Sequence, residues 1–349
     1  MRRARISPVP FAPARPARRS AYNDQPAVPS GSPKNSAHTP RSMSVVSLII
    51  ALLLEQWHPL GDRAKLLSRV ERFADFLEHH FNAGERAHGR IAWLAGVMPA
   101  VLLAIVLHYL LFRLSPPLAL AFNVLVLYLT MGFRHVGHYF TDIHWALKNG
   151  DLERARAILG EWRGAGCERL GAEEIARLTI EEALIAAYQH VFAVVFWFVL
   201  LPGPSGAILY RMSSFLNRRW AGRGDGELAA FGSFAAQIFR LLDWAPARLT
   251  GIAFAVVGDF EDAAYCWRTQ AAKWPDPSLG VVLASGAGAM GVRLGMPFLS
   301  ELNPVDRPEL GLGEDADVGF LDSTIGLVWR ALVVILFILL LLAIARALA

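Results

Sequence analysis

Long apolar runs separated by charged turns dominate the pattern of this chain. The clearest run, Ile91–Leu111, holds 21 residues without Asp, Glu, Lys or Arg, and about 20 apolar residues are needed to cross the ~30 Å of bilayer hydrocarbon. Arg113, Ser115 and a proline pair then interrupt the helical pattern, and the run Leu118–Phe133 returns. We therefore expect a transmembrane hairpin.

Two further spans are expected towards the C-terminus. Val191–Tyr210 is apolar but is broken by the sequence PGPSG, and Ile325–Ala345 closes the chain. Broken helices are tolerated at membrane depth where protein or a polar cavity satisfies the freed backbone groups. Three apolar runs are too short to span unaided, namely Val45–Leu54, Leu249–Val257 and Val281–Met290. The pattern predicts an all-α integral membrane protein with about four transmembrane helices plus short or re-entrant apolar segments.

Two amphipathic helices are predicted between these spans. Asp151 is a suitable N-cap, and the sequence DLERARAILGEWRG that it begins places its apolar residues on one face. A second such helix is expected at Ala172–Ala187. Residues 149–190 are therefore predicted to form a soluble helical insert facing the cytoplasm.

Composition supports a membrane protein and isolates the first 42 residues. Apolar residues make up 54% and charged residues 18% of the chain, whereas a soluble protein carries about 25% charge. Residues 1–42 hold seven Arg, one Lys, one Asp and eight Pro, so they account for the basic balance and lack the apolar side chains for a core. We expect a disordered basic extension, not a nucleic-acid-binding domain, before a membrane domain at 43–349. Translation can begin at Met1 or Met43. The two cysteines are too few for a disulfide framework.

One histidine pattern is a candidate metal site. His135, His138 and Asp142 stand at positions i, i+3 and i+7, which share one helical face. Two imidazoles and a carboxylate are ligands for a divalent metal. The alternative is an interfacial cap in which these residues meet lipid headgroups.

The segment Leu242–Gly295 carries the other candidate residues. Arg248 suits a bidentate contact to phosphate or carboxylate. The carboxylates of the acidic residues can hold a cation or an amine, and small glycines allow close approach. The charged residues of this segment that we single out are Asp243, Arg248, Asp259, Glu261, Asp262 and Arg293. The alternative is a glycine-rich helix-packing surface with solvated charges at its ends.

The amino-acid sequence of this segment resembles that of the CobD/CbiB family. The sequences PARLT, PDPSLG and GAGAMGVRLG, followed by RPELG at Arg307–Gly311, are similar to that family, and the resemblance covers roughly Met43 to Leu332. It implies a multi-pass protein of the bacterial inner membrane that joins aminopropanol, or its phosphate, to a carboxyl group of adenosylcobyric acid. The implied partners are the lipid bilayer and a corrinoid substrate. Neither a cofactor nor an oligomeric state is indicated.

The resemblance also implies roles for the candidate residues. Arg248 and Arg293 would contact phosphate or carboxylate as substrate-binding residues. The catalytic residues, which would contact a metal or the amine, would be Asp243, Asp259 and Asp262.

The chain departs from that family at three polar motifs. An acidic–asparagine motif is absent from Ile185–His190, an NTLD pattern is replaced at Ser214–Asn217, and a PNAG turn reads Pro277–Gly280. The segment LDWAPARLTGIAFAVVGDFEDA and the earlier LEQWHPLGD also resemble AmpE, an inner-membrane protein linked to β-lactamase induction, which lacks these motifs. A non-catalytic AmpE-like signalling role is therefore the alternative to an enzyme. A transporter is less favoured, because no inverted repeat is evident.

Overall fold

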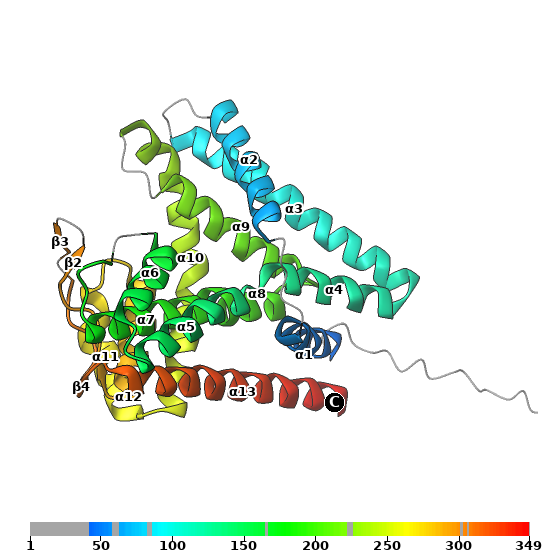
Figure 1. Cartoon of the computed structure of the whole chain (residues 1–349). Coiled ribbons are helices and arrows are strands. Elements are labelled where there is room, and N and C mark those ends of the chain that lie inside the picture. Colours follow the sequence, from blue (N-terminus) through cyan, green and yellow to red (C-terminus); the bar gives the residue numbers. More distant parts are fainter. Residues whose placement is uncertain are drawn as a thin grey trace, which may run out of the picture. The chain divides into compact units, whose positions relative to one another are not determined.

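The protein folds into a bundle of helices with a few very short strands (Figure 1). The structure is a computed structural model and describes residues 42–57, 63–81, 86–164, 167–221, 226–300, 303–305 and 307–348. The elements are α1 (Ser42–Trp57), α2 (Arg63–Phe81), α3 (Arg86–Leu114), α4 (Pro116–Thr130), α5 (Phe133–Lys148), α6 (Leu152–Arg163), α7 (Ala172–Ala187), the π-helix η1 (Tyr188–Phe192), α8 (Ala193–Leu200), α9 (Ser205–Trp220), α10 (Gly226–Val257), α11 (Phe260–Gln270), the 3-10 helix η2 (Ala271–Lys273), α12 (Pro277–Met290), β1 (Val292–Arg293), β2 (Phe298–Ser300), β3 (Asn303–Val305), β4 (Glu314–Asp315) and α13 (Val318–Leu348). The predicted extension at 1–42 lies outside the described residues, apart from Ser42.

The predicted helical hairpin is formed by α3 and α4. Ser115 separates the two helices, and Pro116 opens α4 at a position where its missing N–H costs nothing. α3 has 29 residues and is long and apolar enough to cross a membrane. α4 has only 15 residues, so its length of about 22 Å falls short of the ~30 Å hydrocarbon layer.

The centre of the bundle is one continuous helical run. α7, η1 and α8 follow one another without a break, and together they span Ala172–Leu200. The expected helix at Ala172–Ala187 is confirmed with those bounds, but it continues directly into the apolar segment instead of ending before it. The expected break is confirmed after Leu200, where residues 201–204 form a turn. A soluble insert at 149–190 stays a prediction, because α7 belongs to a run that is apolar enough to cross a membrane.

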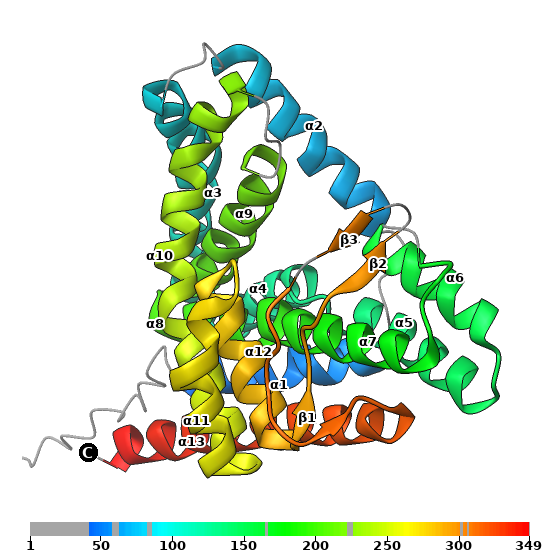
Figure 2. The ribbon, with the colours of Figure 1, turned by 90° about the vertical axis from the view of Figure 1, so that its left-hand side faces the viewer.

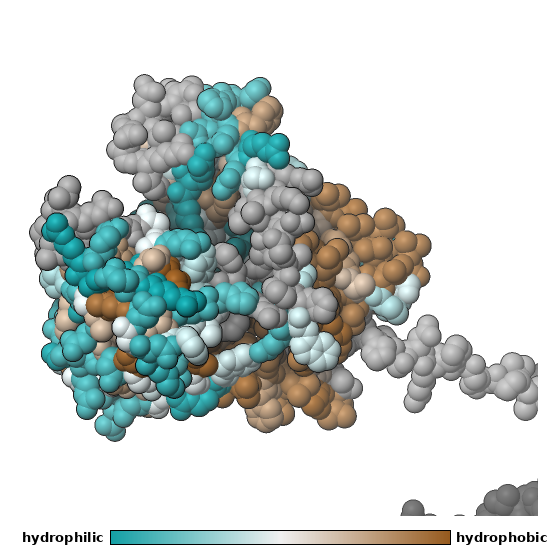
Figure 3. Space-filling view, in the orientation of Figure 1, coloured by the Kyte–Doolittle hydropathy of each residue, from teal (hydrophilic) through white to brown (hydrophobic). Residues whose placement is uncertain are grey.

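Three runs within the described residues could cross a membrane by length and composition, and they are Arg86–Leu114, Ala172–Leu200 and Val318–Ala345. The predicted spans Ile91–Leu111 and Ile325–Ala345 lie inside two of them. Figure 3 shows where the apolar surface gathers: around the α3–α4 turn and the C-terminal half of α13. The side formed by α5, α6 and the C-terminal loop is hydrophilic. The molecule therefore has an apolar part suited to lipid and a polar part suited to water.

The glycine-rich run lies inside α12, where it serves close helix packing. Residues 280–289 of this helix are all buried, and α12 packs against α10 and α11. A Cβ atom on Gly288 would stand 2.5 Å from the carbonyl oxygen of Asp262, which no real side chain tolerates. The glycines of this run thus allow helices to approach, as in other small-residue interfaces.

A loop with short strands joins α12 to α13 and crosses in front of α7 (Figure 2). β1 pairs in parallel with β4, and β2 pairs antiparallel with β3. A further bridge joins Leu294 to Leu310. These strands qualify the all-α prediction, and they bring residues 293–316 over the polar side of the bundle.

We expect Gly288→Ala to lower the free energy of unfolding by about 1–3 kcal/mol, because the added methyl group forces α11 and α12 apart. The matched control is Gly326→Ala in α13, where a Cβ atom meets nothing within 4 Å. The control should change stability by less than about 1 kcal/mol. Thermal unfolding in detergent compares the two variants, and equal midpoints would contradict the packing argument.

Candidate functional site

Pro246 interrupts α10 in the interior of the bundle. A proline within a helix removes the hydrogen bond to the carbonyl four residues earlier and crowds that turn. The carbonyl left without its helical donor is that of Leu242, and Trp197 of the central helical run donates its Nε1–H to it at 3.1 Å. In the same turn, the Tyr188 hydroxyl donates to the carbonyl of Asp243 at 3.0 Å. The broken turn is thereby attached to η1 and α8.

The carboxyl group of Asp243 is the most deeply buried of the predicted site residues. Its side chain is 1% exposed, and the Tyr210 hydroxyl donates to its Oδ1 at 2.7 Å. Burial raises the pKa of Asp243 to about 6, while hydrogen bonds from Tyr188, Tyr210 and Ser278 oppose that rise. Asp243 is therefore held by hydroxyl groups rather than by a cation.

Two of the three stretches that depart from the resembled family contact Asp243. Tyr188 comes from Ile185–His190, and Ser278 comes from Pro277–Gly280. The third stretch adjoins Arg218, whose Nη2 donates to the side-chain oxygen of Gln189. Segments far apart in the sequence thus form one polar region around the end of α7 and η1.

The other predicted site residues have separate partners. Asp259 caps α11, since its Oδ1 accepts the backbone N–H of Asp262 at 3.0 Å. Arg248 lies over its neighbour Trp244, with 4.1 Å from the guanidinium carbon to the ring centroid. The cap lies just beyond the end of α10, which runs about 21 Å from Asp243 to Val257.

Arg293 stands in β1 and forms ion pairs within the C-terminal loop. Its Nη2 lies 2.8 Å from Asp315 Oδ2, and its Nη1 lies 3.9 Å from Glu309 Oε1. The expected grouping of Asp243, Asp259, Asp262, Arg248 and Arg293 is thus not reflected in their contacts, because each side chain engages different neighbours.

Of the three residues in the predicted metal site, the structure describes the side chains of two. His138 and Asp142 are exposed on α5, and the side chain of His135 lies outside the described residues. Within the described ranges, no group of three or more His, Cys, Asp or Glu side chains could hold a metal ion. Cys167 and Cys266 are free and buried.

A second polar cluster lies on α7, and none of its residues was predicted. Glu181 is 3% exposed, and its Oε1 accepts the backbone N–H of Gly295 at 2.8 Å. Its Oε2 accepts a hydrogen bond from Arg307 Nη2 at 2.5 Å. The buried carboxylate thereby ties the C-terminal loop onto α7, as expected for a buried charge that must be paired.

Arginines from four elements, namely α6, α7, α9 and the C-terminal loop, gather near Glu181 and Glu182. Arg163 at the end of α6 pairs with Glu182 at 3.3 Å. The guanidinium carbons of Arg163 and Arg307 each lie 5.1 Å from the ring centroid of Phe298. Arg177 Nη1 lies 3.2 Å from the sulfur of a loop methionine two residues before Phe298. Arg218 and Arg307 both act electrostatically on Glu182. We name the following set the α7 arginine cluster: Arg163, Arg177, Arg218 and Arg307 with Glu181 and Glu182.

Several donors of the α7 arginine cluster are buried without a hydrogen-bond partner in the described protein. They are Arg163 Nη1, Arg177 Nε and Nη2, and Arg307 Nε. A buried donor without an acceptor costs about 1–3 kcal/mol, so such groups call for an explanation. Four arginines face two glutamates, and the surplus positive charge favours an anionic ligand. Figure 3 shows hydrophilic surface on this side of the molecule.

Two signals in the sequence could have indicated this cluster. Glu181 stands between Leu178 and Leu184 on the buried face of an amphipathic helix, where a carboxylate requires a cation. Arg307 belongs to the RPELG motif that carries the family resemblance. Their separation of 126 residues hides the pairing from any local pattern.

We expect Tyr210→Phe to lower the free energy of unfolding by about 1–3 kcal/mol, because it removes the donor to the buried Asp243 carboxyl group. Tyr265→Phe is the matched control, since Tyr265 is 54% exposed. Thermal unfolding in detergent tests both. An effect of Tyr210→Phe no larger than that of the control would contradict the hydrogen-bond assignment.

We expect the free energy of unfolding to decrease as the pH rises from about 4 to about 6, because of Asp243. Because burial raises the pKa of Asp243 from 3.8 to about 6, the folded state keeps a proton that the unfolded chain releases in this range. The loss is on the order of 3 kcal/mol and should be absent in Asp243→Asn. Unfolding midpoints measured across this range test the prediction, with Asp142→Asn as an exposed control. An identical profile in wild type and Asp243→Asn would refute it.

Comparisons with known proteins agree on one family. The CobD/Cbib protein family matches residues 45–328. The chain is 37% identical over 303 residues to the cobalamin biosynthesis protein CobD of Stutzerimonas stutzeri, covering 85% of this chain and 98% of that protein. It is 36% identical over 279 residues to the protein of the same name from Chromobacterium violaceum, covering 77% of this chain and 87% of that protein.

A more distant relative extends the same result. The cobalamin biosynthesis protein CbiB of Salmonella typhimurium is 24% identical over 311 residues, covering 83% of this chain and 94% of that protein. No solved structure matches significantly. The similarity to AmpE remains a prediction. From the family match and the extent of these alignments, the chain belongs to the CobD/CbiB family of cobalamin biosynthesis proteins.

Proposed function

We propose that this protein attaches aminopropanol, or aminopropanol phosphate, to a carboxyl group of adenosylcobyric acid through an amide bond. Its membership of the CobD/CbiB family supports a role in cobalamin biosynthesis. The observation that carries the proposal is the set of buried, unpartnered guanidinium N–H groups in the α7 arginine cluster. A corrinoid carboxylate and an aminopropanol phosphate are both anions, and either would supply the hydrogen-bond acceptors that these N–H groups do not have.

The arginines supply binding and orientation in this proposal. A guanidinium group can hold a carboxylate or phosphate by two parallel hydrogen bonds. Arg177 and Arg307 approach from α7 and from the C-terminal loop, so that a ligand between them would be held from two sides. Fixing both reactants in one orientation supplies a large part of the rate gain in a condensation.

Asp243 is our candidate for handling the proton of the amine. The amine must lose a proton before it can attack the carboxyl carbon, and a base with a pKa near 6 suits that step in neutral solution. As the new C–N bond forms, the carboxyl C–O bond breaks and its oxygen leaves as water. Tyr188 and Gln189 are neighbours that connect Asp243 to Arg218. The predicted contacts of Asp259, Asp262, Arg248 and Arg293 with substrate or metal remain part of the proposal only as secondary candidates, because they engage other partners.

The proposed setting is the bacterial inner membrane, with several passes and a corrinoid substrate approaching from the polar side. We propose α4 as a fourth apolar segment that enters the bilayer with α3 as a hairpin. Arg218 and Arg219 lie at the end of α9, and an excess of such residues favours the cytoplasmic side.

The proposal predicts that Arg177→Gln abolishes corrinoid amide formation by this protein while the protein remains folded. A strain that lacks cobinamide-phosphate synthase and grows on cobyric acid provides the assay. We expect growth with the wild-type chain and at least a roughly tenfold loss with Arg177→Gln, since losing one charged contact costs about 1.5–3 kcal/mol. Arg268→Gln on the exposed side of α11 is the matched control and should grow like wild type.

Arg307 requires a second variant because it also pairs with buried Glu181. Arg307→Gln leaves that carboxylate unpaired, whereas Arg307→Gln with Glu181→Gln removes both charges. We expect the double variant to recover stability without recovering growth. Wild-type growth by the double variant would overturn the substrate role of Arg307. Failure of the well-expressed wild-type chain to support growth would favour the non-catalytic alternative.

A further inference from the structure

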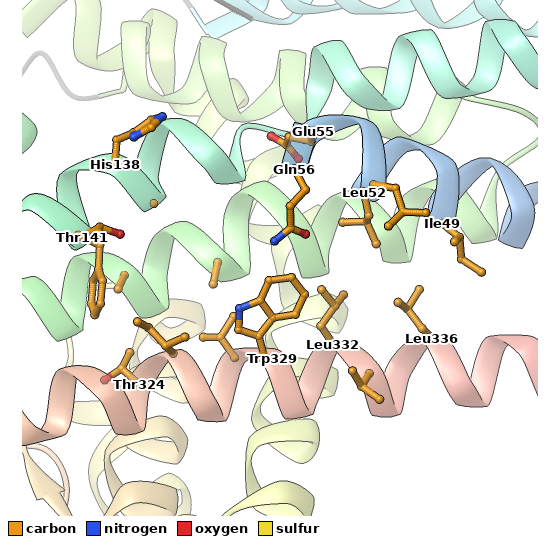
Figure 4. A pocket seen from close by; sticks show the side chains of 18 residues that line it. Ile49, Leu52, Glu55, Gln56, His138, Thr141, Thr324, Trp329, Leu332 and Leu336 are labelled. Atoms are coloured by element: carbon orange, nitrogen blue, oxygen red, sulfur yellow. The ribbon is translucent and has the colours of Figure 1, made fainter. Parts of the chain in front are cut away.

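A groove of 510 Å³ lies between α1, α5, α7 and α13 (Figure 4). Its walls differ from one end to the other. Aliphatic side chains line one end, and they are Ile49, Leu52, Leu53, Leu332, Val333 and Leu336. Polar side chains gather towards the other end, and they are Glu55, Gln56, His138, Thr141 and Thr324. The groove is therefore amphipathic along its length.

The aliphatic end is continuous with the surface that lipid would cover. Leu53 and Val333 line the groove and are 53% and 59% exposed. Farther along α13, Phe337 and Leu341 are also exposed, on a helix that is apolar enough to cross a membrane. A hydrocarbon chain can therefore enter from the bilayer sideways, without passing through water.

The polar end offers both a carboxylate, which can bind the ammonium group of a phospholipid, and N–H donors, which can bind its phosphate. Glu55 lines the groove and is 4% exposed. Glu55 already has a contact within the protein, but a carboxylate can accept from several donors at once. His138 and Gln56 provide N–H groups that can donate to a phosphate, and Figure 4 shows the Gln56 amide beside Trp329 at the middle of the groove.

We propose that this groove binds one membrane phospholipid with an amine-bearing headgroup, such as phosphatidylethanolamine. An acyl chain lies between α1 and α13, the ammonium group meets Glu55, and the phosphate meets His138 and Gln56. The volume of 510 Å³ falls within the range of about 300–1,000 Å³ typical of small-molecule sites. Ala183 and Ala187 of α7 line the groove, and their small side chains leave the space for the chain.

The test is lipid competition for the purified full-length protein in mild detergent. The protein is freed of lipid, exposed to equal amounts of phosphatidylethanolamine and phosphatidylglycerol with the same acyl chains, and analysed by native mass spectrometry. We expect the protein to retain about tenfold more phosphatidylethanolamine than phosphatidylglycerol, which is the factor expected from one charge-assisted hydrogen bond. Glu55→Gln should remove the preference, and Ala183→Leu should reduce retention of both lipids about tenfold by filling the groove.

Leu103→Ala is the matched control, because Leu103 is 66% exposed on α3, away from the groove. It should retain phosphatidylethanolamine like wild type. Equal retention of the two lipids by wild type would overturn the proposal, as would unchanged retention in a folded Ala183→Leu. Displacement of the lipid by free phosphoethanolamine would show a site for a soluble ligand instead. A dimer that Ala183→Leu dissociates would show a second copy in the groove.

Discussion

The attachment of the broken turn in α10 to the central helical run is the contact on which the arrangement of this bundle depends. Pro246 removes the helical N–H that would bond to the carbonyl of Leu242, in a buried place where an unsatisfied polar group is costly. Trp197 supplies that missing donor, and Tyr188 adds a bond to the next carbonyl, that of Asp243, both from one continuous helix. Because both bonds are directional, they fix the position of α10 along that helix as well as its distance. The carboxyl group of Asp243 is then set beside Tyr210, whose hydroxyl donates to it.

The π-helix at Tyr188–Phe192 determines which way the central run faces on each side of this contact. A π turn holds about one residue more than an α turn, so side chains beyond it are rotated by roughly 100° relative to an uninterrupted helix. Before the π turn, ordinary α-helical spacing presents Glu181 and Glu182 to the arginines and Ala183 to the groove. α8 meanwhile turns Trp197 towards α10. One helix thus connects the polar side, the lipid side and the buried carboxyl group.

Local signals in the sequence were sufficient for most of the fold and for little of the site. The hairpin of α3 and α4, the cap at Asp151 and the bounds of α7 follow from prolines, capping residues and apolar periodicity, which act within a few residues. The strongest unpredicted contact joins Glu181 to Arg307 across 126 residues, and no periodicity records such a pairing. Asp259 shows why an acid before a helix is ambiguous in sequence, because a carboxylate suited to chemistry also satisfies a backbone N–H as an N-cap.

The departures from the family's polar motifs do not leave the central helix without carboxylates. The acidic–asparagine motif is missing at Ile185–His190, but Glu181 and Glu182 stand about one turn earlier, or about 5 Å along the axis. Both are already matched by arginines, and the stretch that lost its acid now holds Gln189 against Arg218. A lost acid facing an unchanged cation would leave that cation buried and unpaired, which costs several kcal/mol. Glu181, Glu182 and Gln189 thus each pair with an arginine along this helix.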